Sequence, residues 1–346
     1  MKKTILIFLR RQVAAVAAVA LFSLLSLKAT AEEVPVFITI GQSNADGSAM
    51  FDPGLDADMK QWYESSANTG RMKIWYRSSQ VENQESNALG QKARWVVDGA
   101  VTDFAPGWMN LWYRNEQANG RTAMNMIHSY GTYSTGEGHD CAQGRRGMEP
   151  SFGREFLTAF PESELYIIKL GVSGSFISAW ANPADDTNWN YFVENMFRPA
   201  IADLLSKGKQ PRLAGVWWMQ GCGDAGATKE YYETALRLLI DRIHNELGFP
   251  EAKIYIGEIV KPGESDITPD GSRGYGQGVR DAQMSVAASV PGVELVPTKD
   301  FALQYEEYFN GYIHFSHAGV NAIGRELARR VIADGKDNWA VYKPAQ

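Results

Sequence analysis

Short apolar runs recur along this chain, and they constrain its fold more than any other feature. Each run has four to seven residues, and most lack the polar alternation of a strand that has one face in water. The runs lie at Val36–Ile40, Met72–Tyr76, Leu165–Leu170, Leu213–Met219, Ile254–Ile259 and Val293–Val296. Continuous apolar strands are typical of a parallel sheet that is covered on both faces. The sequence therefore predicts a mostly parallel sheet.

Helical periodicity lies between and after these runs. Apolar residues spaced by three or four positions mark one helix face over Tyr232–Leu247, and Gly248 follows as a helix terminator. A second such face covers Val320–Val331, with Ser316 in position to cap its N-terminus. Strands that alternate with helices indicate an α/β fold, and we expect a doubly wound α/β/α sandwich.

The first 31 residues have the composition of an export signal. Basic residues precede an apolar run of suitable length, and small residues at Ala29–Ala31 supply a cleavage site. We therefore expect residues 1–31 to be removed, leaving 32–346 as a single secreted or periplasmic domain. A membrane anchor is the alternative, but the run is short for a membrane span. We expect no anchor in the mature chain.

The net charge argues against nucleic acid as a partner. The formal charge is −6, and the first 31 residues hold five basic residues and no acidic one, so the mature chain would carry −11. A surface with such an excess of acid repels a polyanion. The sequence carries no comparable indication of an oligomeric state.

Residues 48–147 interrupt the alternation of strands and helices. A structureless loop of that length is implausible in a compact domain, so we expect an ordered insertion. Its tryptophans suit either the core or a platform for sugar rings. They are Trp62, Trp75, Trp95, Trp108 and Trp112. The two cysteines, Cys141 and Cys222, would form a disulfide in an oxidising compartment or remain buried thiols.

The first apolar run leads directly into Gly-Gln-Ser-Asn at residues 41–44. A turn of this kind can hold the hydroxyl of Ser43 at the carboxyl edge of a sheet, where clefts form. A serine nucleophile needs a general base. His314 is the best candidate because it lies in a loop just before the last predicted helix. The other histidines are less suited by position: His128, His139, His244 and His317.

Two further strand ends offer complementary groups. The run at 165–170 ends in Gly-Val-Ser-Gly-Ser, whose backbone N–H groups could meet an oxyanion. The run at 213–219 ends in Gln220 and Gly221, which places a side-chain amide at the same edge. Each turn alone has little specificity, but together with Ser43 and His314 they indicate acyl transfer.

Six segments, in order, resemble the sialate O-acetylesterase-type carbohydrate esterases of the SGNH-hydrolase superfamily. They read GQSNADG, GMEPSFGREF, GVSGSFISAW, WWMQGCGDA, VRDAQMSVA and HFSHAG, and they span essentially the whole mature chain. The resemblance implies a flavodoxin-like sandwich with Ser43 as nucleophile and His314 as base. It implies oxyanion donors at the Ser43 backbone N–H, Gly174 and Gln220. The implied activity is removal of O-acetyl groups from a carbohydrate through an acetyl-serine intermediate, without a cofactor.

The chain departs from the family pattern at two positions. Gly311 stands where the family usually has the triad aspartate, with Asn310 beside it, and Cys222 replaces a glutamate. We therefore expect a Ser43–His314 dyad oriented by main chain, since a backbone carbonyl can fix the imidazole tautomer. Candidate acids elsewhere in the chain are Asp224, Glu258 and Asp300.

Two alternatives to this catalytic assignment follow from the same departures. One is a non-catalytic relative that binds carbohydrate, although the intact Gly41–Asn44 turn, Gln220 and His314 argue against it. The other is catalysis by Cys222, which would need a neighbouring cation that the adjacent sequence lacks. No metal-ligand spacing is visible, and we expect no metal.

Overall fold

The computed structural model describes residues 31–50, 53–68, 70–77, 93–97, 115–116, 122–123, 145–172, 174–259, 276–303 and 313–344. The chain divides into two units, Met1–Glu33 and Val34–Gln346. The export signal predicted at residues 1–31 lies almost entirely outside the described residues. None of the helices in the described ranges has the length and apolarity needed to cross a membrane.

The second unit is built on an eight-stranded sheet in the order β11-β10-β9-β1-β8-β3-β4, with β12 pairing β9. The strands are β1 (Glu32–Gly41), β3 (Met72–Arg77), β4 (Ala93–Val97), β8 (Leu165–Gly171), β9 (Lys209–Met219), β10 (Ile254–Gly257), β11 (Val293–Val296) and β12 (Ala340–Val341). Strands β1, β8 and β3 pair in parallel, as do β9, β10 and β11. Strands β4 and β12 pair antiparallel with β3 and β9. All six predicted runs lie on strands, although β10 ends two residues before the predicted end.

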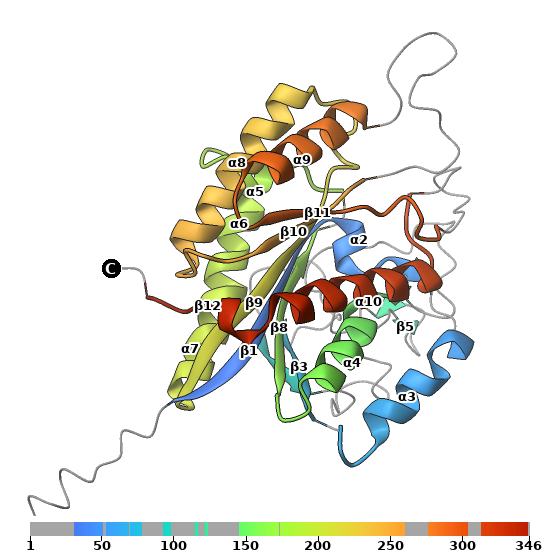
Figure 1. Ribbon diagram of the computed structural model, residues 1–346. Coiled ribbons are helices and arrows are strands. Elements are labelled where there is room, and N and C mark those ends of the chain that lie inside the picture. Colours follow the sequence, from blue (N-terminus) through green and yellow to red (C-terminus); the bar gives the residue numbers. More distant parts are fainter. Residues whose placement is uncertain are drawn as a thin grey trace, which may run out of the picture. The chain divides into compact units, whose positions relative to one another are not determined.

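Helices cover both faces of this sheet, with α8 and α9 on one side and α4 and α10 on the other (Figure 1). The helices are α2 (Ser43–Asp46), α3 (Ala57–Glu64), α4 (Glu149–Ala159), α5 (Ser178–Ala181), α6 (Thr187–Tyr191), the π-helix η3 (Phe192–Phe197), α7 (Arg198–Ser206), α8 (Lys229–Glu246), α9 (Gln277–Ser289) and α10 (His317–Asp334). Two 3₁₀ turns are η1 (Pro53–Asp56) and η5 (Lys336–Asn338). Ser316 caps α10 by accepting from Gly319 N–H, as the sequence predicts. The predicted α/β fold class is confirmed.

Burial on both faces explains why the strands read as continuous apolar runs. Every residue of β8 and β10 is buried, and β1 is buried from Val34 onward. Helix α10 packs on α4, and α8 packs on α9, which removes both faces of the sheet from water. The central strands therefore show no polar alternation.

The region 48–147 contributes two strands to the main sheet. Strand β3 was predicted, but β4 was not. Two small antiparallel pairs also lie in this region, β2 (Ala49–Met50) with β7 (Arg145–Arg146), and β5 (Asn115–Glu116) with β6 (Thr122–Ala123). Trp75 is 5% exposed and Trp62 is partly buried against the core, so these two rings serve packing. The side chains of Trp95, Trp108 and Trp112 lie outside the described residues.

Candidate active site

The turn that carries Ser43 is fixed by a close approach of two strand ends. Gly41 ends β1 with φ 144°, and a Cβ there would lie 2.2 Å from the Met219 carbonyl oxygen at the end of β9. Only glycine fits this contact and this backbone conformation. The next N–H, of Gln42, donates to the same Met219 oxygen at 3.0 Å. Ser43 then begins the four-residue helix α2 and is 4% exposed.

The Gln42 side chain ties this turn to the loop after β9. Its Oε1 accepts hydrogen bonds from Gly221 N–H and Gly223 N–H, both at 3.1 Å. Gln42 is 3% exposed, so these bonds satisfy its oxygen away from water. The loop predicted to carry an oxyanion donor is therefore held against the serine turn.

Asn44, on the other side of Ser43, binds the segment that contains His314. Its Nδ2 donates to the Ile313 carbonyl oxygen at 3.1 Å, and its Oδ1 accepts from Phe315 N–H at 3.2 Å. These two main-chain groups flank His314, which is 1% exposed. A single side chain therefore holds the predicted base beside the predicted nucleophile, across about 270 residues of sequence.

Of the other described histidines, neither replaces His314 in this position. His317 is the first residue of α10 and is 3% exposed. His244 lies on α8, with its Nε2 3.0 Å from the Ala252 carbonyl oxygen. His128 and His139 lie outside the described residues, as do Asn310 and Gly311.

Gln220 follows β9 and is fully buried. Its Nε2 donates to the Ser175 carbonyl oxygen at 3.0 Å and to Asp224 Oδ2 at 2.6 Å, while its Oε1 accepts from Tyr232 Oη at 2.8 Å. A primary amide has two N–H hydrogens, so this arrangement engages both. A role in the oxyanion hole stays a prediction, and it requires one of these bonds to be exchanged for the substrate.

Asp224 joins the loops that follow β8 and β9. Its Oδ2 accepts from Ile177 N–H at 2.8 Å as well as from Gln220. Burial raises the pKa of this carboxyl above its ordinary value, and the hydrogen bonds from Gln220 and Ile177 oppose that shift. A role as acid partner of His314 stays a prediction. Of the other two candidate acids, Asp300 is exposed and Glu258 is partly buried.

Gly174 lies in the loop after β8, in the left-handed region with φ 73°. A Cβ built there meets nothing within 4 Å, so the backbone at this point borders open space. A Cβ on Gly223 would by contrast lie 2.7 Å from the Ser175 carbonyl oxygen, which shows how closely the loops after β8 and β9 pack. The predicted groups thus lie on three neighbouring strand ends and the segment before α10.

A buried ion pair that the sequence analysis missed lies beneath the serine turn. Lys169 Nζ on β8 is 2.7 Å from Glu149 Oε1 at the start of α4, and both side chains are fully buried. Gly171, two residues after Lys169, approaches α2 so closely that a Cβ would lie 2.4 Å from Asp46 Cα. The sequence feature that could have indicated this ion pair is Lys169 itself, because it lies inside the otherwise apolar run at 165–170.

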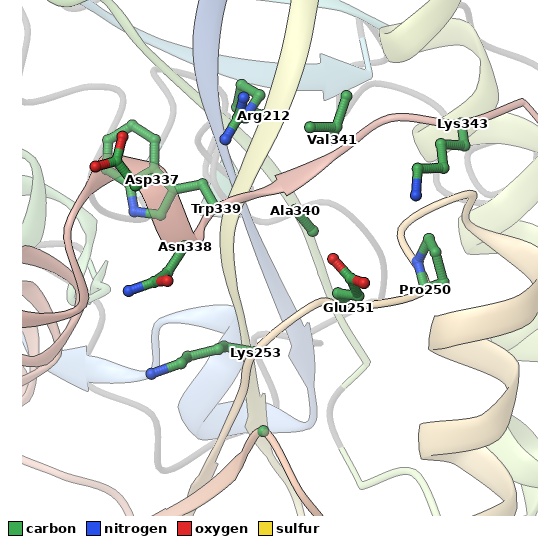
Figure 2. A pocket seen from close by; sticks show the side chains of 11 residues that line it. Arg212, Pro250, Glu251, Lys253, Asp337, Asn338, Trp339, Ala340, Val341 and Lys343 are labelled. Carbon is green, nitrogen blue, oxygen red and sulfur yellow. The ribbon is translucent and has the colours of Figure 1, made fainter.

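A cavity of about 500 Å³ lies at the opposite ends of the strands. Figure 2 shows Arg212, Lys253, Trp339 and Lys343 among its lining side chains. Arg212 lies near the start of β9, and Lys253 immediately precedes β10 and pairs with Asp334. None of the predicted site residues that the structure describes lines this cavity. Cys222 is partly buried, and Cys141 lies outside the described residues, so a disulfide between them stays a prediction.

A comparison with known families identifies the family of this chain. Residues 33–333 match the model of the family described as "Carbohydrate esterase, sialic acid-specific acetylesterase". The chain belongs to this family. The resemblance read from the six sequence segments is therefore confirmed, as is the assignment to an esterase family.

Two solved structures share the fold at low sequence identity, and a third is similar with a lower TM-score. NanS is 14% identical with a TM-score of 0.51, over 89% of this chain and 99% of that one. A protein from Arabidopsis thaliana is 16% identical with a TM-score of 0.50, over 87% and 99% of the two chains. A carbohydrate acetylesterase from Xanthomonas citri is 16% identical with a TM-score of 0.48, over 87% and 56%. No curated protein matches the sequence.

Proposed function

We propose that this carbohydrate esterase removes O-acetyl groups from a glycan through an acetyl–Ser43 intermediate. The observation that carries the proposal is the pair of hydrogen bonds from Asn44 to the residues on either side of His314. They bring the base segment to the serine turn at the carboxyl edge of the sheet, where α/β enzymes bind ligands. Family membership supports the substrate class, an acetylated carbohydrate.

In the proposed reaction, His314 takes the proton from Ser43 Oγ as that oxygen attacks the acetyl carbonyl carbon. The backbone N–H groups of Ser43 and Gly174 stabilise the oxyanion, and the Gln220 amide joins them if it exchanges a present bond. His314 then gives its proton to the sugar oxygen as the C–O bond breaks. Water, deprotonated by His314, then attacks the carbonyl carbon of acetyl–Ser43, and His314 returns that proton to Ser43 Oγ as the bond between Oγ and the acetyl carbon breaks and acetate leaves.

We favour the dyad form of this mechanism because Gly311 stands where the family usually has its acid. The main-chain contacts of Asn44 fix the position of the His314 backbone without an acid three residues earlier. In the alternative form of this mechanism, a carboxylate partner orients His314. Asp224 is the leading candidate for that partner, and Asp224→Asn tests it.

Export is part of the proposal. The composition of residues 1–31 supports a cleaved signal and a secreted or periplasmic enzyme. N-terminal sequencing of the exported protein should find Glu32 as the first residue. Retention of the leader in the exported protein would refute the cleavage site.

The catalytic proposal is tested with Ser43→Ala, and Ser206→Ala on the exposed end of α7 serves as its control. Acetate release from p-nitrophenyl acetate and from acetylated xylo-oligosaccharides should fall by several orders of magnitude in the first variant only. A serine-directed organophosphonate should label Ser43. Labelling of a different serine, with activity kept in Ser43→Ala, would refute the nucleophile. Glycan binding without acetate release by the wild type would identify a non-catalytic relative.

A further inference from the structure

Phe176 is a large apolar side chain that the fold leaves in water. It follows Gly174 and Ser175 in the loop after β8, and 57% of its surface is exposed, whereas Ser175 and Ile177 are buried. A single exposed phenylalanine is ordinary at a protein surface. Phe176 differs from such a residue in two respects: buried hydrogen bonds hold the backbone on both sides of it, and it lies two residues after the predicted oxyanion glycine.

The backbone on both sides of Phe176 is held by the buried amide and carboxylate after β9. The Ser175 carbonyl oxygen accepts from Gln220 Nε2 at 3.0 Å, and Ile177 N–H donates to Asp224 Oδ2 at 2.8 Å. The Ser175 hydroxyl also accepts from Trp180 Nε1 at 3.1 Å. Buried bonds of this kind fix the chain, so the exposed ring projects from a rigid support and little order is lost when a ligand packs on it.

The position of Phe176 relative to the reaction site follows from the chain itself. Burial alternates along the loop, with Gly174 and Phe176 exposed and Ser175 and Ile177 buried. Two residues span at most about 7 Å, so Phe176 lies within that distance of the predicted oxyanion glycine, measured between Cα atoms. The backbone at Gly174 borders open space in which a substrate can lie.

We propose that Phe176 is a substrate-binding residue whose ring packs against the C–H face of the sugar that carries the acetyl group. The proposal rests on the esterase function proposed above and adds a contact to the carbohydrate. An aromatic ring suits this role because its apolar face matches the C–H face of a sugar ring. The contact is made with the sugar and not with the acetyl group, so it should not affect a substrate without a sugar.

The test compares a sugar ester with a simple ester. Phe176→Ala should raise KM for acetylated xylo-oligosaccharides or for O-acetylated sialic acid, whichever the wild type hydrolyses, by roughly tenfold. Its kinetics with p-nitrophenyl acetate should stay within about twofold of wild type. Phe176→Trp should keep the low KM. Leu205→Ala serves as the control, since Leu205 is 40% exposed in the last turn of α7, which precedes the start of β9.

The results of these assays separate the role of Phe176 from the esterase proposal. An unchanged KM for the carbohydrate, or an equal loss with both esters, overturns the role of Phe176. Failure of the esterase proposal is separate, because it appears as activity retained by Ser43→Ala in the same assays. If the wild type hydrolyses p-nitrophenyl acetate but neither carbohydrate, the proposed sugar contact is refuted.

Discussion

Replacing Asn44 with alanine tests whether one side chain holds the base segment on the serine turn. Asn44→Ala removes the bond to the Ile313 carbonyl oxygen at 3.1 Å and the bond from Phe315 N–H at 3.2 Å. The Phe315 N–H is buried, so losing its acceptor costs about 1–3 kcal/mol, and the partly buried Ile313 bond contributes about 0.5–1.5 kcal/mol. We therefore expect the free energy of unfolding to fall by about 1.5–4.5 kcal/mol.

The same change should lower kcat in the fraction that remains folded. A displacement of a catalytic group by about 1 Å can reduce the rate by about 10², and we expect a loss of that size as His314 loses its support. Asn44→Asp keeps the acceptor for Phe315 N–H but places a second acceptor against the Ile313 oxygen. Its free energy of unfolding and its kcat should therefore lie between those of the wild type and of Asn44→Ala. Urea unfolding and steady-state hydrolysis of p-nitrophenyl acetate measure both effects.

A matched control is Asn190→Ala, because the bond from Asn190 to the Asp186 side chain is exposed. It should change the free energy of unfolding by no more than about 0.5 kcal/mol. If Asn44→Ala matches this control in stability and keeps the wild-type kcat, the link through Asn44 does not position His314.

Three further changes test the buried groups around the site. Lys169→Met should cost about 3–5 kcal/mol in urea unfolding, because it leaves Glu149 buried without its partner, and the double variant with Glu149→Leu should recover most of the loss. Asp224→Asn keeps an oxygen acceptor and should keep most of the activity, whereas a loss of about 10⁴ in kcat would identify a triad acid. Burial raises the pKa of Asp224, so the folded state favours the protonated carboxyl. The contribution of this carboxyl to the free energy of unfolding is therefore complete below about pH 3.9 and is lost as the pH rises through the folded-state pKa. The melting temperature of Asp224→Asn relative to wild type should accordingly be higher at about pH 7 than at about pH 3.5. Gln220→Ala should lower the melting temperature because it releases Asp224 and Tyr232, and an unchanged melting temperature with a kcat loss of about 10²–10³ would instead show that the amide serves only the oxyanion.

The sheet was largely predictable because its strands are buried on both faces. The segment Leu165–Leu170 has a continuous apolar pattern because every residue of β8 is buried. Strand β4, at Ala93–Val97, was not predicted, because it is a short edge strand and its antiparallel partner β3 lies about twenty residues earlier. An edge strand carries a weaker apolar signal than a central one.

That the candidate site residues would gather at one edge of the sheet was predictable, but the hydrogen bonds among them were not. Ser43, Gly174 and Gln220 follow strands, so the rule that strand ends gather at one edge places them together. The bonds of Gln220 to Ser175 and Asp224 depend on side-chain orientations within the folded loops, and no spacing in the sequence encodes them. The contact between Asn44 and the His314 segment likewise required the tertiary structure.

The distance along the chain between Asn44 and its partners has a consequence for when activity appears. Ser43 follows the first strand of the sheet, while Ile313 and Phe315 precede the last long helix. Contacts of such high sequence separation form late, because the entropy of closing a long loop is lost before the contact is gained. A growing chain that ends before Ile313 would contain the serine turn but not the segment that carries the predicted base. The proposed catalytic pair therefore needs segments from both ends of the domain, so the onset of esterase activity would report that the C-terminal segment has bound the serine turn.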